Sequence, residues 1–138
     1  GQPTCLIMLD LDHFKAVNDA YGHEVGNIVL SHISNLISQS VRRLDSPCRY
    51  GGEEFTIILP DTTLEQGIRF ANRLRLIIEN SPVKTSDVLL GIEASFGVDV
   101  FIKGEELLEK EFLEKVDSFL YLAKQEGRNQ VCHASIDD

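Results

Sequence analysis

No stretch of the sequence approaches the roughly 20 consecutive apolar residues that a membrane-spanning helix needs, although 43% of the residues are hydrophobic. The first apolar run, residues 5–9, is too short for the core of a signal peptide and has no basic flank. We therefore expect residues 1–138 to form one domain around one core. We expect it in the cytoplasm, and a membrane anchor elsewhere in a parent protein would not contradict this.

Basic residues are few. The chain has 13 Lys and Arg against 22 Asp and Glu, a formal net charge of -9. Binding to a DNA or RNA backbone needs clustered positive charge, so neither polymer is an expected partner. A single nucleotide can still bind if a metal ion and a few local cations offset its phosphates.

The three cysteines, Cys5, Cys48 and Cys132, are odd in number and far apart. Since no pair has the spacing of metal ligands, we do not predict a zinc site. Two of them lie in apolar, strand-like runs. We expect buried free thiols, as in a reducing cytoplasm.

The apolar pattern predicts an α+β fold close to the α/β class, a mixed sheet with helices packed against it. The expected elements, in the order β-α-β-β-α-β-α-β, are a buried strand at 4–9, a helix at 25–41, a hairpin of 47–50 and 56–59, a helix at 64–78, one or two strands in 89–101, a helix at 112–123 and an edge strand at 130–133. Thr62 and Glu65 form an expected capping box for the second helix. Asn80-Ser81-Pro82 should end that helix, and Gly127 the next one.

Two acidic clusters stand out, Asp10-Leu11-Asp12 after the first strand and Glu53-Glu54 after a glycine pair. If the clusters meet, a hard divalent cation with oxygen ligands, Mg²⁺ or Mn²⁺, is their natural partner. Gly51 and Gly52 carry no side chain, so a large ligand can approach the backbone there. Alternatively, the aspartates cap the following turn and the glycines form only a tight turn.

Three sequence blocks resemble the GGDEF family of diguanylate cyclases. Gly-Gly-Glu-Glu-Phe at 51–55, after Arg49-Tyr50, is similar to the family signature. LDLDHFKAVNDAYGHEVGN at 9–27 is similar to its first strand and nucleotide loop, and LAKQEGRNQV at 122–131 to its last helix and strand. The likeness implies one catalytic domain over 1–138 with a palm-like sheet, as in class III nucleotide cyclases. The family's leading helix, with its Asp-x-Leu-Thr and Asn-Arg-Arg pattern, is missing from this sequence.

The resemblance also implies a reaction, in which two GTP molecules form cyclic di-GMP and two pyrophosphates across a homodimer. The implied metal ligands are the side chains of Asp10 and Glu53 and the carbonyl oxygen of Leu11. Glu54 would assist the metal or accept the proton of the ribose 3′-OH. The implied substrate contacts are the amides of His13, Phe14 and Lys15, the open backbone at Gly51 and Gly52, the cations Lys124 and Arg128, and the nucleotide-loop residues Asn18, His23 and Asn27. Without the resemblance, His23 is as well read as structural, and Lys124 and Arg128 as solvated charges at a helix end.

Arg42 and Asp45 form an Arg-x-x-Asp motif shortly before Gly51. In the family, this motif is an inhibitory site for the product, and Arg73 aligns with a further arginine of that site. Forked guanidinium donors suit phosphates and guanine edges. The alternative is a surface ion pair.

Asn27 replaces the aspartate that the family uses to accept from guanine, and an amide accepts only part of that pattern. Three functions follow from the sequence. The chain is an active cyclase, a degenerate domain that binds GTP or cyclic di-GMP, or a cyclase with relaxed base choice. In each case we expect an upstream sensor or regulatory domain in the parent protein.

Overall fold

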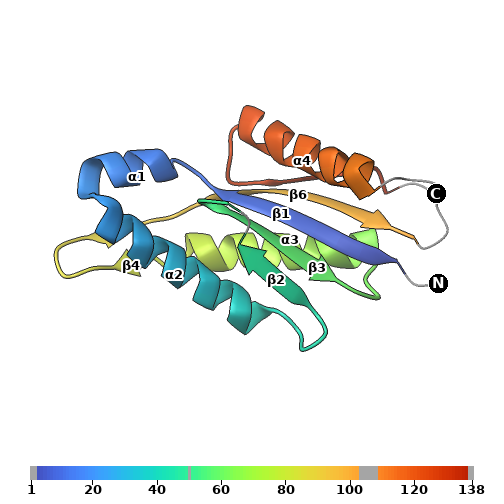
Figure 1. The fold of residues 1–138 in the computed structure, drawn as a ribbon, viewed down its shortest axis with the longest axis horizontal. Coiled ribbons are helices and arrows are strands. Elements are labelled where there is room, and N and C mark those ends of the chain that lie inside the picture. The colour runs from blue at the N-terminus through green and yellow to red at the C-terminus, as the bar shows by residue number, and fades with distance from the viewer. Residues whose placement is uncertain (1–2, 50, 103–108, 137–138) are drawn as a thin grey trace.

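The computed structural model describes residues 3–49, 51–102 and 109–136. Its centre is a five-stranded sheet in the order β2-β3-β1-β6-β7 (Figure 1). The strands are β1 (Thr4–Leu11), β2 (Ser46–Arg49), β3 (Glu54–Leu59), β6 (Ala94–Phe101) and β7 (Val131–His133). Neighbours pair antiparallel except β6 and β7, which are parallel. The predicted α+β fold with a mixed sheet is confirmed.

Helices cover both faces of this sheet, as Figure 1 shows. They are α1 (Phe14–Tyr21), α2 (His23–Ser40), α3 (Leu64–Glu79) and α4 (Glu109–Gln125). Helices α2 and α3 pack on one face, and α4 packs on the other. None of the helices within the described ranges combines the length and the apolar character needed to cross a bilayer.

Strand β1 is buried on both faces because it lies in the middle of the sheet. Side chains alternate along a strand, so Ile7 and Leu9 join the larger core under α2 and α3, whereas Leu6 and Met8 pack against α4. The same alternation places Asp10 on the α4 face. The long apolar run that ends at a carboxylate thus carries that carboxylate into a buried position beside α4.

Helix α4 approaches the sheet closely at Gly97 of β6. A Cβ atom at Gly97 would lie 2.5 Å from the backbone nitrogen of Leu120 and 2.5 Å from the carbonyl oxygen of Val116. Backbone atoms cannot rotate away as a side chain can. Glycine at this position therefore sets the spacing between α4 and the strands that carry the acidic residues.

The elements differ from the expectations in two places. Residues 14–21 form a separate helix, α1, where only a nucleotide loop was expected. The expected strands within 89–101 belong to different sheets, because β5 (Leu89–Leu90) pairs only with β4 (Val83–Lys84), a strand that was not predicted. The hairpin around Gly51-Gly52 is confirmed, although position 50 lies outside the described residues.

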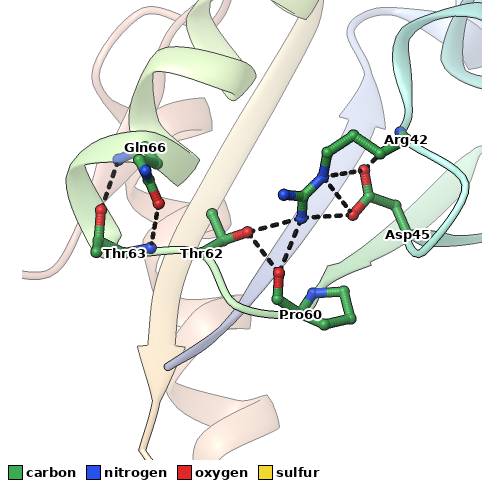
Figure 2. A network of polar contacts seen from close by, with 6 residues as sticks. All are labelled: Arg42, Asp45, Pro60, Thr62, Thr63 and Gln66. Carbon is green, nitrogen blue, oxygen red and sulfur yellow. Dashed lines mark hydrogen bonds and ion pairs between the residues drawn. The ribbon is translucent and has the colours of Figure 1, made fainter. Parts of the chain in front are cut away.

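The capping box predicted at Thr62 and Glu65 is wrong by one residue. The Gln66 amide donates to Thr63 Oγ1 at 3.2 Å, and the Thr63 amide donates to Gln66 Oε1 at 2.9 Å (Figure 2). Thr62 is buried instead, and its hydroxyl donates to the carbonyl of Pro60. Both threonines fit the sequence pattern, and the burial of Thr62 decides between them.

The expectation of buried thiols holds for one cysteine. Cys5 is buried, and burial raises the pKa of its thiol to about 12. Cys48 is exposed and Cys132 is half-buried. Cys48 lies on β2, an edge strand whose residues are all exposed, so its place in a strand does not bury it.

Replacing Gly97 with Ala should destabilise the fold, because the added methyl group meets the α4 backbone. Overpacking of this kind costs about 1–3 kcal/mol. Urea denaturation measures the change. Gly91→Ala is the matched control, since a Cβ there meets no atom within 4 Å. Equal denaturation midpoints for the two variants would contradict the close approach of α4.

Candidate functional site

The two acidic clusters meet at one end of the sheet, which is the condition that the sequence analysis set for a metal site. Asp10 lies directly opposite Glu54 in the antiparallel pairing of β1 and β3. The Leu11 amide also donates to the carbonyl of Glu53 at 3.4 Å. The pairing register of the two strands therefore brings Asp10 and Glu53-Glu54 side by side.

Asp10 is a buried carboxylate with one oxygen left unpaired. Its side chain forms an ion pair through Oδ2 with Lys124 of α4. Its Oδ1 is buried and has no hydrogen-bond partner among the described residues. Burial raises the pKa of Asp10, Lys124 lowers it, and the negative charges of Glu53 and Asp12 raise it. The net shift is upward, so the ionised form lacks compensation that a further cation would provide.

Glu54 is half-buried and faces α4. Burial raises the pKa of its carboxyl, the charges of Asp117 and Asp10 raise it further, and Lys124 lowers it. Glu54 lies at the edge of a cavity of about 380 Å³ between the strands and α4. That cavity is lined by Met8, Glu54, Thr56, Leu113, Glu114 and Asp117. Asp117 was not among the predicted site residues, because only helix packing brings it near Glu54.

Asp12 connects the first acidic cluster to the loop after α4. Ser95 Oγ donates to Asp12 Oδ1 at 2.7 Å, and the Asn129 amide donates to Asp12 Oδ2 at 3.0 Å. Both oxygens of this buried side chain are therefore occupied by the protein. The alternative interpretation, that Asp12 caps the next turn, is wrong, because the N-cap of α1 is His13. Asp12 fixes the loop that carries Arg128 beside the end of β1.

The loop with Arg128 is unusual in its backbone. Arg128 and Asn129 both have left-handed conformations, with φ of 64° and 46°. Such conformations persist when surrounding contacts hold them. The Asn129 side chain supplies some of these contacts, because its Nδ2 donates to Glu79 Oε1 at 2.7 Å and to Glu93 Oε2 at 3.3 Å.

The residues predicted to hold phosphate lie directly after Asp12. His13, at φ 60°, is the N-cap of α1, and Phe14, the first residue of the helix, is buried. Lys15 is exposed and pairs with Asp19 at 3.7 Å. Amides in the first turn of a helix have no intrahelical partner and lie at the positive end of its dipole. An anion can therefore approach the backbone at residues 13–15.

The predicted nucleotide-loop residues lie on the α1–α2 pair. Asn18 is half-buried on α1, whereas His23 and Asn27 are exposed in the first two turns of α2. At the hairpin turn, Gly51 and Gly52 are exposed, and a Cβ at either position would meet no atom within 4 Å. The turn therefore leaves room beside the acidic residues for a bulky ligand.

Arg42 and Asp45 form an ion pair. The alternative interpretation of their motif expected this pair at the surface, but Asp45 is buried. Arg42 Nη2 donates to Asp45 Oδ1 at 2.8 Å, to the Pro60 carbonyl at 2.8 Å and to Thr62 Oγ1 at 2.9 Å, as Figure 2 shows. The Asp45 side chain is 1% exposed, whereas that of Arg42 is 53% exposed. Arg42 therefore compensates a buried charge and still presents part of its guanidinium to solvent.

The same two residues line a cavity of about 270 Å³ together with Arg73, which the resemblance assigns to the same site, and with Arg69, which was not predicted. Arg73 lies over the ring of Phe70, 5.3 Å from its centroid. The cavity lies away from the acidic cluster, because Leu59 pairs with Cys5 and Glu54 with Asp10 at opposite ends of β3. Five residues of strand correspond to roughly 17 Å.

Comparisons with known proteins identify the family of this chain. Residues 1–130 match the family model described as "Diguanylate cyclase, GGDEF domain". The response regulator PleD of Caulobacter vibrioides is 39% identical over 133 residues, which are 95% of this chain and 29% of PleD. The chain thus spans less than a third of that relative.

Solved structures share the fold. The GGDEF domain of DgcB from Caulobacter crescentus, solved in complex with c-di-GMP, has a TM-score of 0.89 and 31% identity, over 96% of this chain and 78% of that chain. The active GGEEF domain of a diguanylate cyclase from Vibrio cholerae has a TM-score of 0.86 and 30% identity, over 99% of this chain and 85% of that chain. As its Gly-Gly-Glu-Glu-Phe signature predicted, this chain belongs to the GGDEF family of diguanylate cyclases.

Proposed function

We propose that this chain condenses two GTP molecules into cyclic di-GMP and two pyrophosphates with the help of Mg²⁺ or Mn²⁺. The observation that carries the proposal is the buried, unpaired Oδ1 of Asp10 beside Glu53 and Glu54. The Vibrio cholerae domain with the same GGEEF signature is described as active. That likeness favours catalysis over a degenerate domain that only binds nucleotides.

A hard divalent cation fits the oxygen donors at this end of the sheet. The proposed ligands are the carboxylates of Asp10 and Glu53 and the carbonyl of Leu11. Within the described ranges, no group of three or more His, Cys, Asp or Glu side chains is placed to hold a metal. This agrees with Mg²⁺, which usually takes one or two carboxylates and completes its shell with water and substrate phosphates. When bound, the ion would offset phosphate charge and favour the attacking 3′ oxygen.

Lys124 would serve two partners in turn. It pairs with Asp10 in the structure, and a cation at Asp10 would weaken that pair. The freed ammonium could then contact phosphate together with Arg128 and the amides of His13, Phe14 and Lys15. Phosphoryl transfer depends mainly on such positioning and charge compensation.

Glu54 is proposed either to support the metal site or to accept the 3′-OH proton. Its raised pKa suits the second role, since a base works best when its pKa lies near the working pH. Asn18, with Asn27 and His23 nearby on α2, would contact the guanine base, and Gly51 and Gly52 would leave room for the nucleotide. Because Asn27 is a neutral amide, we expect weaker guanine preference than an aspartate would give.

Two chains are needed for one product molecule. Cyclic di-GMP has two-fold symmetry, and one site per chain holds one GTP, so two chains would face each other antiparallel. The product is also proposed to bind at the cavity of Arg42, Asp45, Arg69 and Arg73 and to inhibit. PleD is named a response regulator, which supports an upstream regulatory or sensor domain as a further partner.

Glu53→Gln should lower cyclic di-GMP formation at least about 100-fold, since even changes behind a metal ligand cost roughly 10- to 100-fold. Product identified by mass after incubation with GTP and Mg²⁺ measures the effect. Glu111→Gln, an exposed charge change on α4, is the control for fold and solubility. Wild-type rates for Glu53→Gln would remove Glu53 from the metal site. An unaltered chain that binds GTP without forming product would instead be a binding module.

Activity per chain should fall on dilution, because the dimer dissociates before the two GTP molecules can meet. Initial rates measured across protein concentrations, with the mass of the particle followed by light scattering, test this. An excess of the Glu53→Gln chain should also suppress the unaltered chain, since mixed pairs hold one inactive site. Rates strictly proportional to concentration in the monomeric range would exclude a two-chain site.

Arg73→Ala should weaken cyclic di-GMP binding about 10- to 100-fold, the range of one hydrogen bond to a charged group, and relieve inhibition without loss of stability. Arg42→Ala should weaken binding and also destabilise the fold, because it leaves the Asp45 carboxylate buried without its cation. Calorimetry and urea denaturation separate the two effects. Arg43→Ala, an exposed arginine outside the cavity lining, is the control. Unchanged product affinity in both variants would dismiss the cavity as the inhibitory site.

A further inference from the structure

Helix α2 carries a glycine where α1 packs against it. A Cβ atom at Gly26 would lie 1.9 Å from Asn18 Oδ1, 3.0 Å from Asn18 Cγ and 3.3 Å from Phe14 Cζ. A separation of 1.9 Å is far below any real contact of a Cβ atom. The amide oxygen of Asn18 therefore occupies the volume that any other residue at position 26 would fill.

The backbone around this contact leaves little freedom to relieve it. The Gly22 amide donates to the carbonyl of Asn18 at 2.8 Å, and the Gly26 amide donates to the carbonyl of Gly22 at 3.2 Å. These bonds link the end of α1 to the start of α2. Gly22, at φ 90°, forms the turn between the two helices. A side chain at position 26 would thus displace the Asn18 side chain rather than separate the helices.

The Asn18 side chain is the group that a residue larger than glycine at position 26 would move. Asn18 is half-buried, and its side-chain amide makes no hydrogen bond within the described part of the chain. Its donors and acceptor are therefore available to a ligand. We propose that Gly26 is a positioning residue for guanine recognition. Because it has no side chain, it leaves space for the Asn18 amide in the orientation that contacts the base. This inference rests on the proposed contact between Asn18 and guanine.

A double-mutant cycle tests the inference on this chain. The probes are the α,β-methylene analogues of GTP and ATP with Mg²⁺, which bind without transfer, and calorimetry gives their affinities. Gly26→Ala should weaken the GTP analogue roughly 10-fold, the range of one or two lost hydrogen bonds, and leave the ATP analogue unchanged. Asn18→Ala should have a similar effect. Gly26→Ala should then add no further loss when introduced into the Asn18→Ala chain, where the colliding oxygen is absent.

Gly67→Ala is the matched control for steric damage. A Cβ at Gly67 of α3 would lie 2.3 Å from Cys5 Sγ, so that variant should lower the melting temperature while the preference for the GTP analogue stays the same. Gly26→Ala should instead lower the preference for the GTP analogue without lowering the melting temperature, because alanine favours a helix more than glycine does.

The outcomes separate the inference from the proposed function. Equal loss of GTP-analogue affinity by Gly26→Ala with and without Asn18 would show that Gly26 acts through helix packing, and would overturn the inference alone. Unchanged affinity in Gly26→Ala alongside a loss in Asn18→Ala would also overturn it. No effect of Asn18→Ala would overturn the inference and remove Asn18 from the base site. Failure of the unaltered chain to bind the GTP analogue would defeat the proposed function itself.

Discussion

The register of β1 between its two antiparallel neighbours decides where each acidic side chain lies. Asp10 faces Glu54 on β3 and Ser95 on β6, so the end of one buried strand gathers groups from three segments of the chain. A shift of one residue would turn Asp10 toward the apolar core under α2 and α3. The buried residues Ile7 and Leu9 oppose that shift, because it would move them out of their core. The packing of the core thus maintains the geometry of the site.

Two aspartates only two residues apart have different surroundings at this strand end. Asp12 has both oxygens occupied by Ser95 and Asn129, so it joins β1 to the loop after α4. Asp10 has one oxygen paired with Lys124 and one unpaired. A buried oxygen without a hydrogen-bond partner lowers the stability of the fold. Such an oxygen is common at binding sites, where a bound ligand becomes its partner. The contrast favours Asp12 as a structural residue and Asp10 as the proposed metal ligand.

The cavity lined by Arg42, Arg69 and Arg73 lies at the other end of strand β3. Arg42 connects the loop before β2 with Pro60 and Thr62 after β3, so a ligand that draws Arg42 away would loosen the open end of this hairpin. The hairpin turn carries Glu53. Coupling between two sites requires that a ligand at one changes the free energy of the other. The β2–β3 hairpin lies between the two proposed sites.

The sequence by itself predicted the strands of the central sheet, the hairpin, the helices α2, α3 and α4 and the family, because these depend on local periodicity and on short motifs. It missed α1 and β4, which are short. It also identified both acidic clusters and the Arg-x-x-Asp motif. Only the tertiary structure decided which oxygen of Asp10 stays unpaired and that Asp12 accepts hydrogen bonds from groups 83 and 117 residues away. It also placed Asp117 near Glu54, and Arg69 in the cavity of Arg42 and Arg73. Only burial distinguished Thr62 from Thr63. These contacts depend on how helices pack against the sheet, and packing at that range leaves no periodic trace in the sequence.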